Sequence, residues 1–377
     1  MADGSIDRPN GVGRRLPPPP PRAPINTKPA QHRSVPPPLP PEALSTGDLL
    51  DWLAQGLPVE IHPDDVTEII PIVLAAGKKI GNYELVRKLG IGGCAEVWEA
   101  KNIETDEPVA IKINIRKDDK HLFREQGVLE GLAGKKGTVR LIEGMAEDGY
   151  IVMELVKGRS LDSLLAQRPA LEDRINYQRY TARCLAAVAR VLHILQDIHS
   201  GQNGIVHGDL SLDNIFLREN AKGEGEVVII DWGIAYGLNE TPPSKIDGKL
   251  QYLAPERLME MKIDPRSDIY ALGCMLYTLL LNIPFPEEDA IAEQNLQEAV
   301  KLVTMKRVLG QAFSLKEYQI REQLRLGMGN EVADSVTNLL IKMTTGKLKN
   351  RFADALEAAQ AVEPIITHLF RQTAKIT

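Results

Sequence analysis

The chain changes its pattern of apolar residues near Leu161, and this change limits the folds that it can adopt. Between residues 82 and 155 the apolar residues come in short runs separated by turn residues, which is typical of strands. After Leu161 they recur mainly at helical spacing, apart from one β-rich stretch over residues 205–234. The pattern predicts an α+β fold with a small β-rich lobe and a larger helical lobe. Ligand sites prefer the cleft between such lobes.

Individual elements follow from the same periodicity. The small lobe is expected to hold one helix, over residues 121–132, and five strands, over 83–89, 95–101, 109–115, 139–145 and 150–155. In the large lobe, helices are expected over residues 269–281, 290–309 and 315–326.

The region before the small lobe has a different composition. Thirteen of the 25 prolines lie at or before Pro41, in a segment with six Lys or Arg and two acidic residues. Such a segment cannot bury enough apolar surface to offset chain entropy, so residues 1–41 are predicted to be a disordered, basic tail. It is either a solvated leader or a docking tail for an aromatic-lined groove of a partner. Residues 42–79 are predicted to be a short helical flank, used for packing or for partner binding.

Charge and cysteine content exclude other classes of protein. The net charge of −6 argues against a nucleic-acid scaffold. Apolar runs fall short of the roughly 18 to 20 residues that cross a bilayer, so no membrane span is expected. Cys94, Cys184 and Cys274 are widely separated, which suits neither a disulfide framework nor a CxxC metal site. A reducing, cytoplasmic location is therefore expected.

A glycine-rich turn, residues 90–97, joins two of the predicted strands. Its glycines allow backbone N–H groups to approach an anion, although an ordinary hairpin has the same pattern. Lys112 follows in an otherwise apolar strand, where an ammonium group is costly to bury without an anionic partner. Glu125 or phosphate oxygens are suitable partners, and a strand-edge lysine that reaches water is the alternative.

Three further polar residues come after the long helical stretch. Asp209 and Asn214 lie in the segment HGDLSLDN, and Asp231 ends an apolar run. Asn214 and Asp231 in one cleft would hold Mg²⁺ against a triphosphate, because this ion takes oxygen ligands. The alternative is that the two aspartates are ordinary turn residues.

In order and spacing, these motifs resemble those of the eukaryotic-like Ser/Thr protein kinases, in the version common in bacteria, over roughly residues 82–361. The series continues with the segments YLAPE and SDIYALG and with Arg351. The resemblance implies a two-lobed protein-kinase-like fold with an N-lobe over 80–156, a C-lobe over 157–365 and a C-terminal end over 366–377. It also implies ATP- and Mg²⁺-dependent transfer of the γ-phosphate to Ser/Thr hydroxyls of protein substrates.

The resemblance assigns roles to individual side chains. Lys112 would grip the α- and β-phosphates and pair with Glu125. Asp209 would orient the acceptor hydroxyl and accept its proton, while Asn214 and Asp231 would hold Mg²⁺.

Other positions would support this machinery. Asp268 would brace the catalytic loop, Glu256 and Arg351 would form a buried ion pair, and residues 154–158 would meet adenine. The expected nucleotide-binding set is Gly90, Ile91, Gly92, Gly93, Cys94, Ala95, Val97, Ala110, Lys112, Met153, Glu154, Val156, Asn214 and Asp231.

Two departures from the family bear on regulation and binding. Ala95 replaces the third glycine, and ATP binding is expected to survive this change. Gly208 replaces the arginine that in many relatives reads a phosphorylated activation loop. Activity is therefore expected not to require phosphorylation of Thr241 or Ser244.

Cys94, at the tip of the glycine loop, is either redox-sensitive or simply a small side chain.

The other two departures form a pair. Ser211 stands where the family usually has a lysine that contacts the transferred phosphate, and Lys249 stands where it usually has a threonine. Because one cation from either side of Asp209 would serve, we hypothesise that Lys249 points into the cleft as a catalytic replacement. The alternative is a solvated loop lysine and a slower enzyme.

Two other functions are compatible with parts of the pattern. A small-molecule phosphotransferase would share the segment HGD followed by an asparagine, whereas Asp268 and Arg351 favour a platform for a polypeptide. A pseudokinase or nucleotide-binding scaffold would leave the catalytic residues idle, although all of them are present. The protein substrate and a partner of the proline-rich tail stay open.

Overall fold

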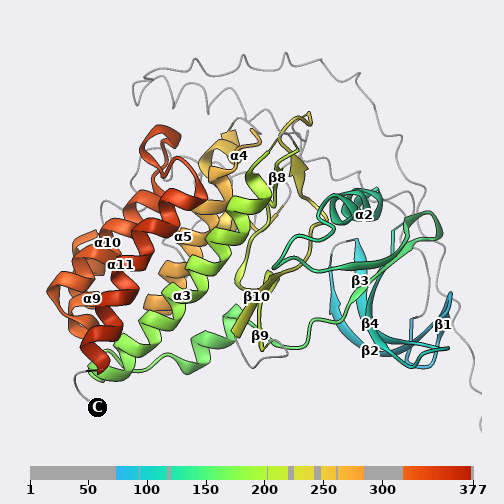
Figure 1. The fold of residues 1–377 in the computed structure, drawn as a ribbon, viewed down its shortest axis with the longest axis horizontal. Helices are drawn as coiled ribbons and strands as arrows, with labels where there is room; N and C mark the ends of the chain where they lie inside the picture. Colours follow the sequence, from blue (N-terminus) through green and yellow to red (C-terminus); the bar gives the residue numbers. More distant parts are fainter. Residues whose placement is uncertain are drawn as a thin grey trace, which may run out of the picture. The chain divides into compact units, whose positions relative to one another are not determined.

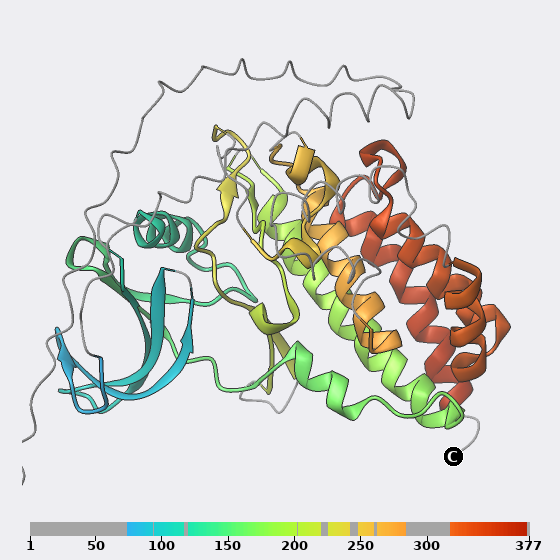
Figure 2. The same ribbon diagram turned by 180° about the vertical axis from the view of Figure 1, so that it is seen from behind.

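The computed structural model describes residues 74–92, 94–116, 120–201, 203–219, 225–241, 248–259, 262–283 and 317–374. All of them belong to one compact unit of the chain. The predicted tail over 1–41, most of the flank over 42–79 and the predicted helix over 290–309 lie outside the described residues. Figures 1 and 2 show a small lobe built on a curled sheet and a large lobe built on long helices, so the expected α+β architecture is confirmed.

The small lobe contains a six-stranded antiparallel sheet in the order β1-β2-β3-β4-β6-β5. Each predicted strand and the predicted helix are confirmed, with ends within two residues of the expected ones, and the short strand β1 is added. The elements are β1 (Lys79–Ile80), β2 (Tyr83–Ile91), β3 (Ala95–Asn102), β4 (Pro108–Asn114), α2 (His121–Gly131), β5 (Leu141–Met145) and β6 (Tyr150–Glu154).

Strand β4 shows how the alternation of side chains separates core from cleft. Val109, Ile111 and Ile113 are buried in the apolar cluster on one face of the sheet. Successive side chains in a strand point to opposite faces, so Ala110 and Lys112 lie on the other face. That face borders the cavity described below.

The large lobe is built around two helices, α3 (Arg174–His199) and α5 (Arg266–Leu281). The carboxylate of Asp173 caps α3 by accepting the backbone N–H of Asn176. Every residue from Ser267 to Leu281 is buried, which explains the apolar sequence of α5. Packed around these two are α9 (Glu317–Met328), α10 (Asn330–Thr344) and α11 (Ala355–Ala374).

These helices also bear on the expected element bounds. The predicted helix over 269–281 is confirmed, and the one expected over 315–326 appears as α9. Helix α11 runs across residue 365, so the boundary placed there falls inside a helix. Among the described residues, no helix is both long and apolar enough to cross a membrane.

Short strands in the large lobe carry the polar segments. The pair β8–β11 and the sheet β10-β9-β7 bring residues 207–214 and 231–235 together. The bounds are β7 (Arg159–Ser160), β8 (Ile205–Val206), β9 (Ile215–Glu219), β10 (Gly225–Ile229), β11 (Tyr236–Gly237) and α4 (Pro255–Met259), with single 3₁₀ turns at Ala146–Asp148, Leu161–Gln167, Leu212–Asn214, Leu250–Tyr252 and Leu348–Asn350.

Candidate active site

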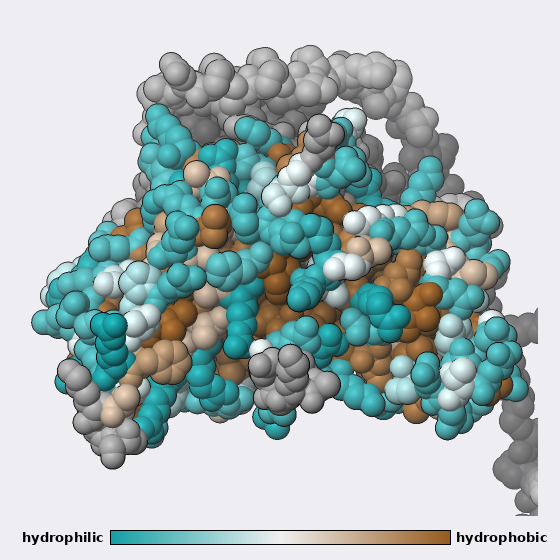
Figure 3. Space-filling view, in the orientation of Figure 1, coloured by the Kyte–Doolittle hydropathy of each residue, from teal (hydrophilic) through white to brown (hydrophobic). Residues whose placement is uncertain are grey.

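A cavity of about 660 Å³ lies between the sheet of the small lobe and the β9 region of the large lobe. Figure 3 shows apolar residues gathered in this hollow, with hydrophilic residues around them. Nine residues of the predicted nucleotide-binding set line it, namely Gly90, Val97, Ala110, Lys112, Met153, Glu154, Val156, Asn214 and Asp231.

The tip of the glycine-rich turn does not line this cavity. Ile91, Gly92, Cys94 and Ala95 are absent from its walls, and Gly93 lies outside the described residues. The turn closes through a hydrogen bond from the Gly92 N–H to the Ala95 carbonyl, 2.8 Å long. Contact of these residues with a nucleotide therefore stays a prediction.

Lys112 lies between two carboxylates. Its Nζ is 2.6 Å from Glu125 Oε2 and 2.7 Å from Asp231 Oδ1. Burial would lower the pKa of Lys112, but the two carboxylates outweigh it and raise this pKa above its ordinary value. The alternative of a strand-edge lysine that reaches water is therefore wrong. Burial raises the pKa of Glu125 as well, although the charge of Lys112 opposes this rise.

Asp231 has an unusual backbone conformation as well. Its φ is +61°, in the left-handed region that costs a non-glycine residue of order 1 kcal/mol or more. Burial would raise the pKa of Asp231, but the nearby Lys112 lowers it on balance, so the carboxylate is ionised. The turn presents an ionised oxygen ligand at the cavity wall.

Asp268 of α5 binds the backbone of the segment HGD through hydrogen bonds. Its Oδ2 accepts the His207 backbone N–H at 2.9 Å and a hydrogen bond from His199 Nε2 at 2.9 Å, while Oδ1 accepts the Gly208 N–H at 3.0 Å. The His207 ring packs on Trp232 with centroids 4.5 Å apart. The predicted bracing role of Asp268 is confirmed.

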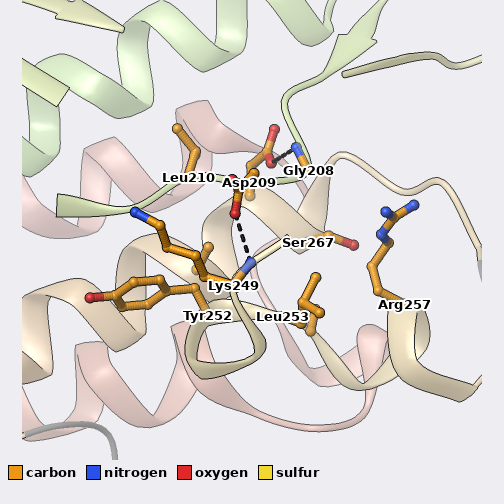
Figure 4. Close-up of a pocket in the computed structure, with 11 residues that line it drawn as sticks. Gly208, Asp209, Leu210, Lys249, Tyr252, Leu253, Arg257 and Ser267 are labelled. Atoms are coloured by element: carbon orange, nitrogen blue, oxygen red, sulfur yellow. Dashed lines mark hydrogen bonds between the residues drawn. The ribbon is translucent and has the colours of Figure 1, made fainter. Parts of the chain in front are cut away.

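Asp209 lines a second, small pocket, together with Lys249 and Arg257 (Figure 4). Asn214 Nδ2 donates to the Asp209 carbonyl at 3.0 Å, and the Lys249 backbone N–H donates to Asp209 Oδ1 at 2.8 Å. Burial raises the pKa of the Asp209 carboxyl, although the Lys249 N–H opposes this rise. A carboxylate oriented in this way is suited to accept a proton.

The structure also explains the glycine at position 208. Its φ is +77°, and a Cβ there would lie 3.3 Å from the Ile234 carbonyl oxygen. An arginine would therefore be strained at this position, whatever space its side chain found. The sequence showed that glycine replaces arginine at this position. It did not show that the backbone is left-handed there, because the types of the neighbouring residues do not fix φ.

Two arginines that sequence reasoning missed meet at the Tyr236 ring, which lies next to Gly208. Arg124 and Arg257 both stack on the Tyr236 ring, at 4.6 Å and 5.1 Å. Arg124 Nη1 is also paired with Glu240 Oε2 at 2.9 Å, which ties α2 to the segment after β11. The only sequence signal was the position of Arg124 directly before Glu125.

The predicted ion pair in the large lobe is confirmed. Arg351 Nη1 and Nη2 donate to Glu256 Oε1 and Oε2 at 2.7 Å and 3.1 Å, and both side chains are buried. This fork-to-fork geometry is the strong form of an arginine–carboxylate contact. It anchors the segment YLAPE to the loop that precedes α11.

Comparison with known proteins agrees with this geometry. Residues 83–364 match the family described as "Protein kinase domain". The chain is 28% identical over 289 residues to a probable serine/threonine-protein kinase PknB of Lactococcus lactis, covering 73% of this chain and 40% of that protein. It is 28% identical over 293 residues to the serine/threonine-protein kinase PrkC of Bacillus subtilis, covering 74% and 40%. The chain thus spans less than half of these relatives. Since the family match covers most of the chain, the chain belongs to the protein kinase family.

Proposed function

We propose that this chain is an ATP- and Mg²⁺-dependent Ser/Thr protein kinase. The observation that carries the proposal is the convergence of five side chains, Lys112, Glu125, Asp209, Asn214 and Asp231, around one cavity. Four of them line it, and Asp209 lies one hydrogen bond away through Asn214. In phosphoryl transfer, groups of these kinds bind the phosphates and the metal ion, orient the acceptor hydroxyl and remove its proton.

The nucleotide would lie in the apolar part of the cavity. Val97, Ala110 and Met153 offer apolar surface for a base, and residues 154–158 line the cavity where their backbone would meet its polar edge. Lys112 would bind the phosphates, because its ammonium group faces the cavity between Glu125 and Asp231.

The residues present fit a divalent cation. Asp231 is ionised, and the Asn214 amide binds the Asp209 carbonyl through Nδ2, which leaves Oδ1 for another ligand. Asn214 and Asp231 would hold Mg²⁺, which when bound neutralises charge on the phosphates.

Asp209 would act as the base. Its Oδ1 is occupied by the Lys249 N–H, so Oδ2 is the oxygen that would accept the proton of a Ser or Thr hydroxyl. The raised pKa of Asp209 increases its affinity for that proton. Asp268 keeps the loop in place through the backbone of His207 and Gly208.

The test is incubation of the purified chain with labelled ATP, Mg²⁺ and a general protein substrate, beside an Asp209→Asn variant. We expect label on Ser and Thr, and a loss of at least about 10²-fold in the variant, since general bases contribute 10²- to 10⁴-fold. ATP affinity, measured by equilibrium dialysis, should change little. A chain that binds ATP and labels no protein would be a scaffold, and the proposal would be wrong.

Two expectations stay outside these observations. A partner for the proline-rich tail concerns residues that the structure does not describe. A cytoplasmic location stays a prediction from the cysteines, of which Cys94, Cys184 and Cys274 form no disulfide.

A further inference from the structure

We propose that Lys249 is a further catalytic residue, whose ammonium group binds the transferred phosphoryl group in place of a lysine at position 211. This inference rests on the proposed kinase function and extends it. It concerns the two positions at which serine and lysine stand in an unusual arrangement around Asp209.

The contacts of Lys249 support this role. Its Nζ donates to Ser211 Oγ at 2.9 Å and to Asp213 Oδ2 at 2.8 Å, and its backbone N–H donates to Asp209 Oδ1 at 2.8 Å. In Figure 4 the side chain runs past the Asp209 carboxylate toward Leu210, away from Arg257. The ammonium group therefore lies beside position 211, where Ser211 is buried and carries no charge.

The ammonium group is also close to the nucleotide cavity. Asp213, its partner at 2.8 Å, is one of the residues that line that cavity. Lys249 is also joined to Asp209 directly, because its backbone N–H donates to Asp209 Oδ1 at 2.8 Å. A phosphoryl group held between the cavity and Asp209 would lie within the field of this ammonium group.

The present partner of Lys249 does not hold it firmly. The Lys249 side chain is 43% exposed and that of Asp213 is 64% exposed. Exposed ion pairs of this kind contribute little to stability, so the ammonium group can exchange Asp213 for a more highly charged phosphate at small cost.

Other described cations around Asp209 are already engaged. Lys112 is bound by Glu125 and Asp231, and Arg257 is stacked on the Tyr236 ring. Lys249 is therefore the cation that the described part of the chain offers on the Asp209 side of the cavity.

The reaction step balances with Lys249 as a hydrogen-bond donor only. The acceptor hydroxyl oxygen forms a bond to the γ-phosphorus, the bond from that phosphorus to the β–γ bridging oxygen breaks, and ADP leaves with the electron pair. The hydroxyl proton goes to Asp209 Oδ2. Lys249 keeps its protons and donates one hydrogen bond to a γ-phosphoryl oxygen, which offsets charge in the transition state.

The first test compares Lys249→Met with Lys249→Arg in the labelled-ATP assay on the full chain. The backbone bond to Asp209 is present in both variants, so only the cation differs. We expect Lys249→Met to lose about 10²- to 10³-fold in kcat, the usual effect of removing one preorganised donor, with KM for ATP and the unfolding temperature nearly unchanged. Lys249→Arg should lose less than about tenfold, since it keeps a cation.

A matched control is Lys342→Met in α10. Its side chain is also 43% exposed and is paired with Glu357 at 2.7 Å, far along the chain from the catalytic segments. This variant should turn over at the rate of the unaltered chain.

A second test moves the lysine to the other position. The double variant Ser211→Lys with Lys249→Thr should be at least tenfold faster than Lys249→Thr alone. The proposal is wrong if the kcat of Lys249→Met stays within threefold of that of the unaltered chain, or if Lys249→Arg has as low a kcat as Lys249→Met. It is also wrong if the double variant unfolds at the normal temperature but has no higher kcat than Lys249→Thr. No transfer by the unaltered chain would instead refute the proposed function, and this inference with it.

Discussion

Replacing Arg351 by methionine should destabilise the large lobe, because it removes the hydrogen bonds that the Arg351 guanidinium donates. The Arg351 side chain is 0% exposed and donates five hydrogen bonds, two to Glu256, two to the Thr345 carbonyl and one to the Arg266 carbonyl. Methionine keeps much of the volume and provides none of the donors. Glu256 would then keep only its bond from the Ser267 hydroxyl, 2.8 Å long.

The expected loss in free energy of unfolding comes from the Glu256 carboxylate, which stays buried without its partner. Removing one partner of a buried ion pair costs about 3 to 5 kcal/mol, because the other charge is left without compensation. In a domain of this size each 1 kcal/mol lowers the unfolding temperature by about 2 to 4 °C, so Arg351→Met should unfold roughly 6 to 20 °C earlier. Glu256→Gln in the same background should recover part of this, since a neutral amide is cheaper to bury.

The measurement is thermal unfolding followed by circular dichroism, for the two single variants and the double variant. Arg325→Met is a suitable control, because its side chain is 32% exposed and is paired with Glu322 and Asp334. The control should unfold at nearly the temperature of the unaltered chain, because exposed ion pairs contribute little to stability. If Arg351→Met unfolds within 3 °C of the unaltered chain, or if the two single losses simply add, the buried-pair reasoning is refuted.

Alanine at Thr241 and Ser244 together should leave kcat within about threefold, because Gly208 provides no guanidinium beside Asp209 that would read a phosphate on these hydroxyls; a tenfold loss in the labelled-ATP assay would contradict this. Burial raises the pKa of Asp268, but its hydrogen bonds, first the one from His199, lower this pKa on balance. The ionised Asp268 therefore stabilises the fold above the ordinary aspartate pKa of about 3.9, and this stabilisation is lost as the pH falls further. Urea unfolding should therefore show a weaker acid dependence for Asp268→Asn, and equal slopes in variant and unaltered chain would count against this assignment.

Much of the small lobe was predictable because its information is local. The alternation of β4 separates Val109 and Ile111 from Ala110 and Lys112, and a period of two is visible in the sequence itself. The cost of burying an ammonium group then required an anionic partner for Lys112. Both statements depend only on residue type and spacing, and Glu125 was found by the same reasoning.

Other features required the folded chain. The left-handed backbone at Gly208 and the stack of Arg124 and Arg257 on Tyr236 arise where four separate segments meet. No spacing rule relates those residues, because their distances depend on how β11, α2 and α4 pack. The same holds for Asp213 as a partner of Lys249, which composition and periodicity did not indicate.

Residue identity and periodicity alone determined the two-lobed architecture and the polar side chains of the site, because strands, helices and charge burial follow local rules. Only the tertiary structure decided that the Lys249 ammonium lies 2.9 Å from Ser211 Oγ, across 38 positions of the chain. Such a contact depends on the packing of two loops against Asp209, and the geometry of loops is set by the elements that hold their ends.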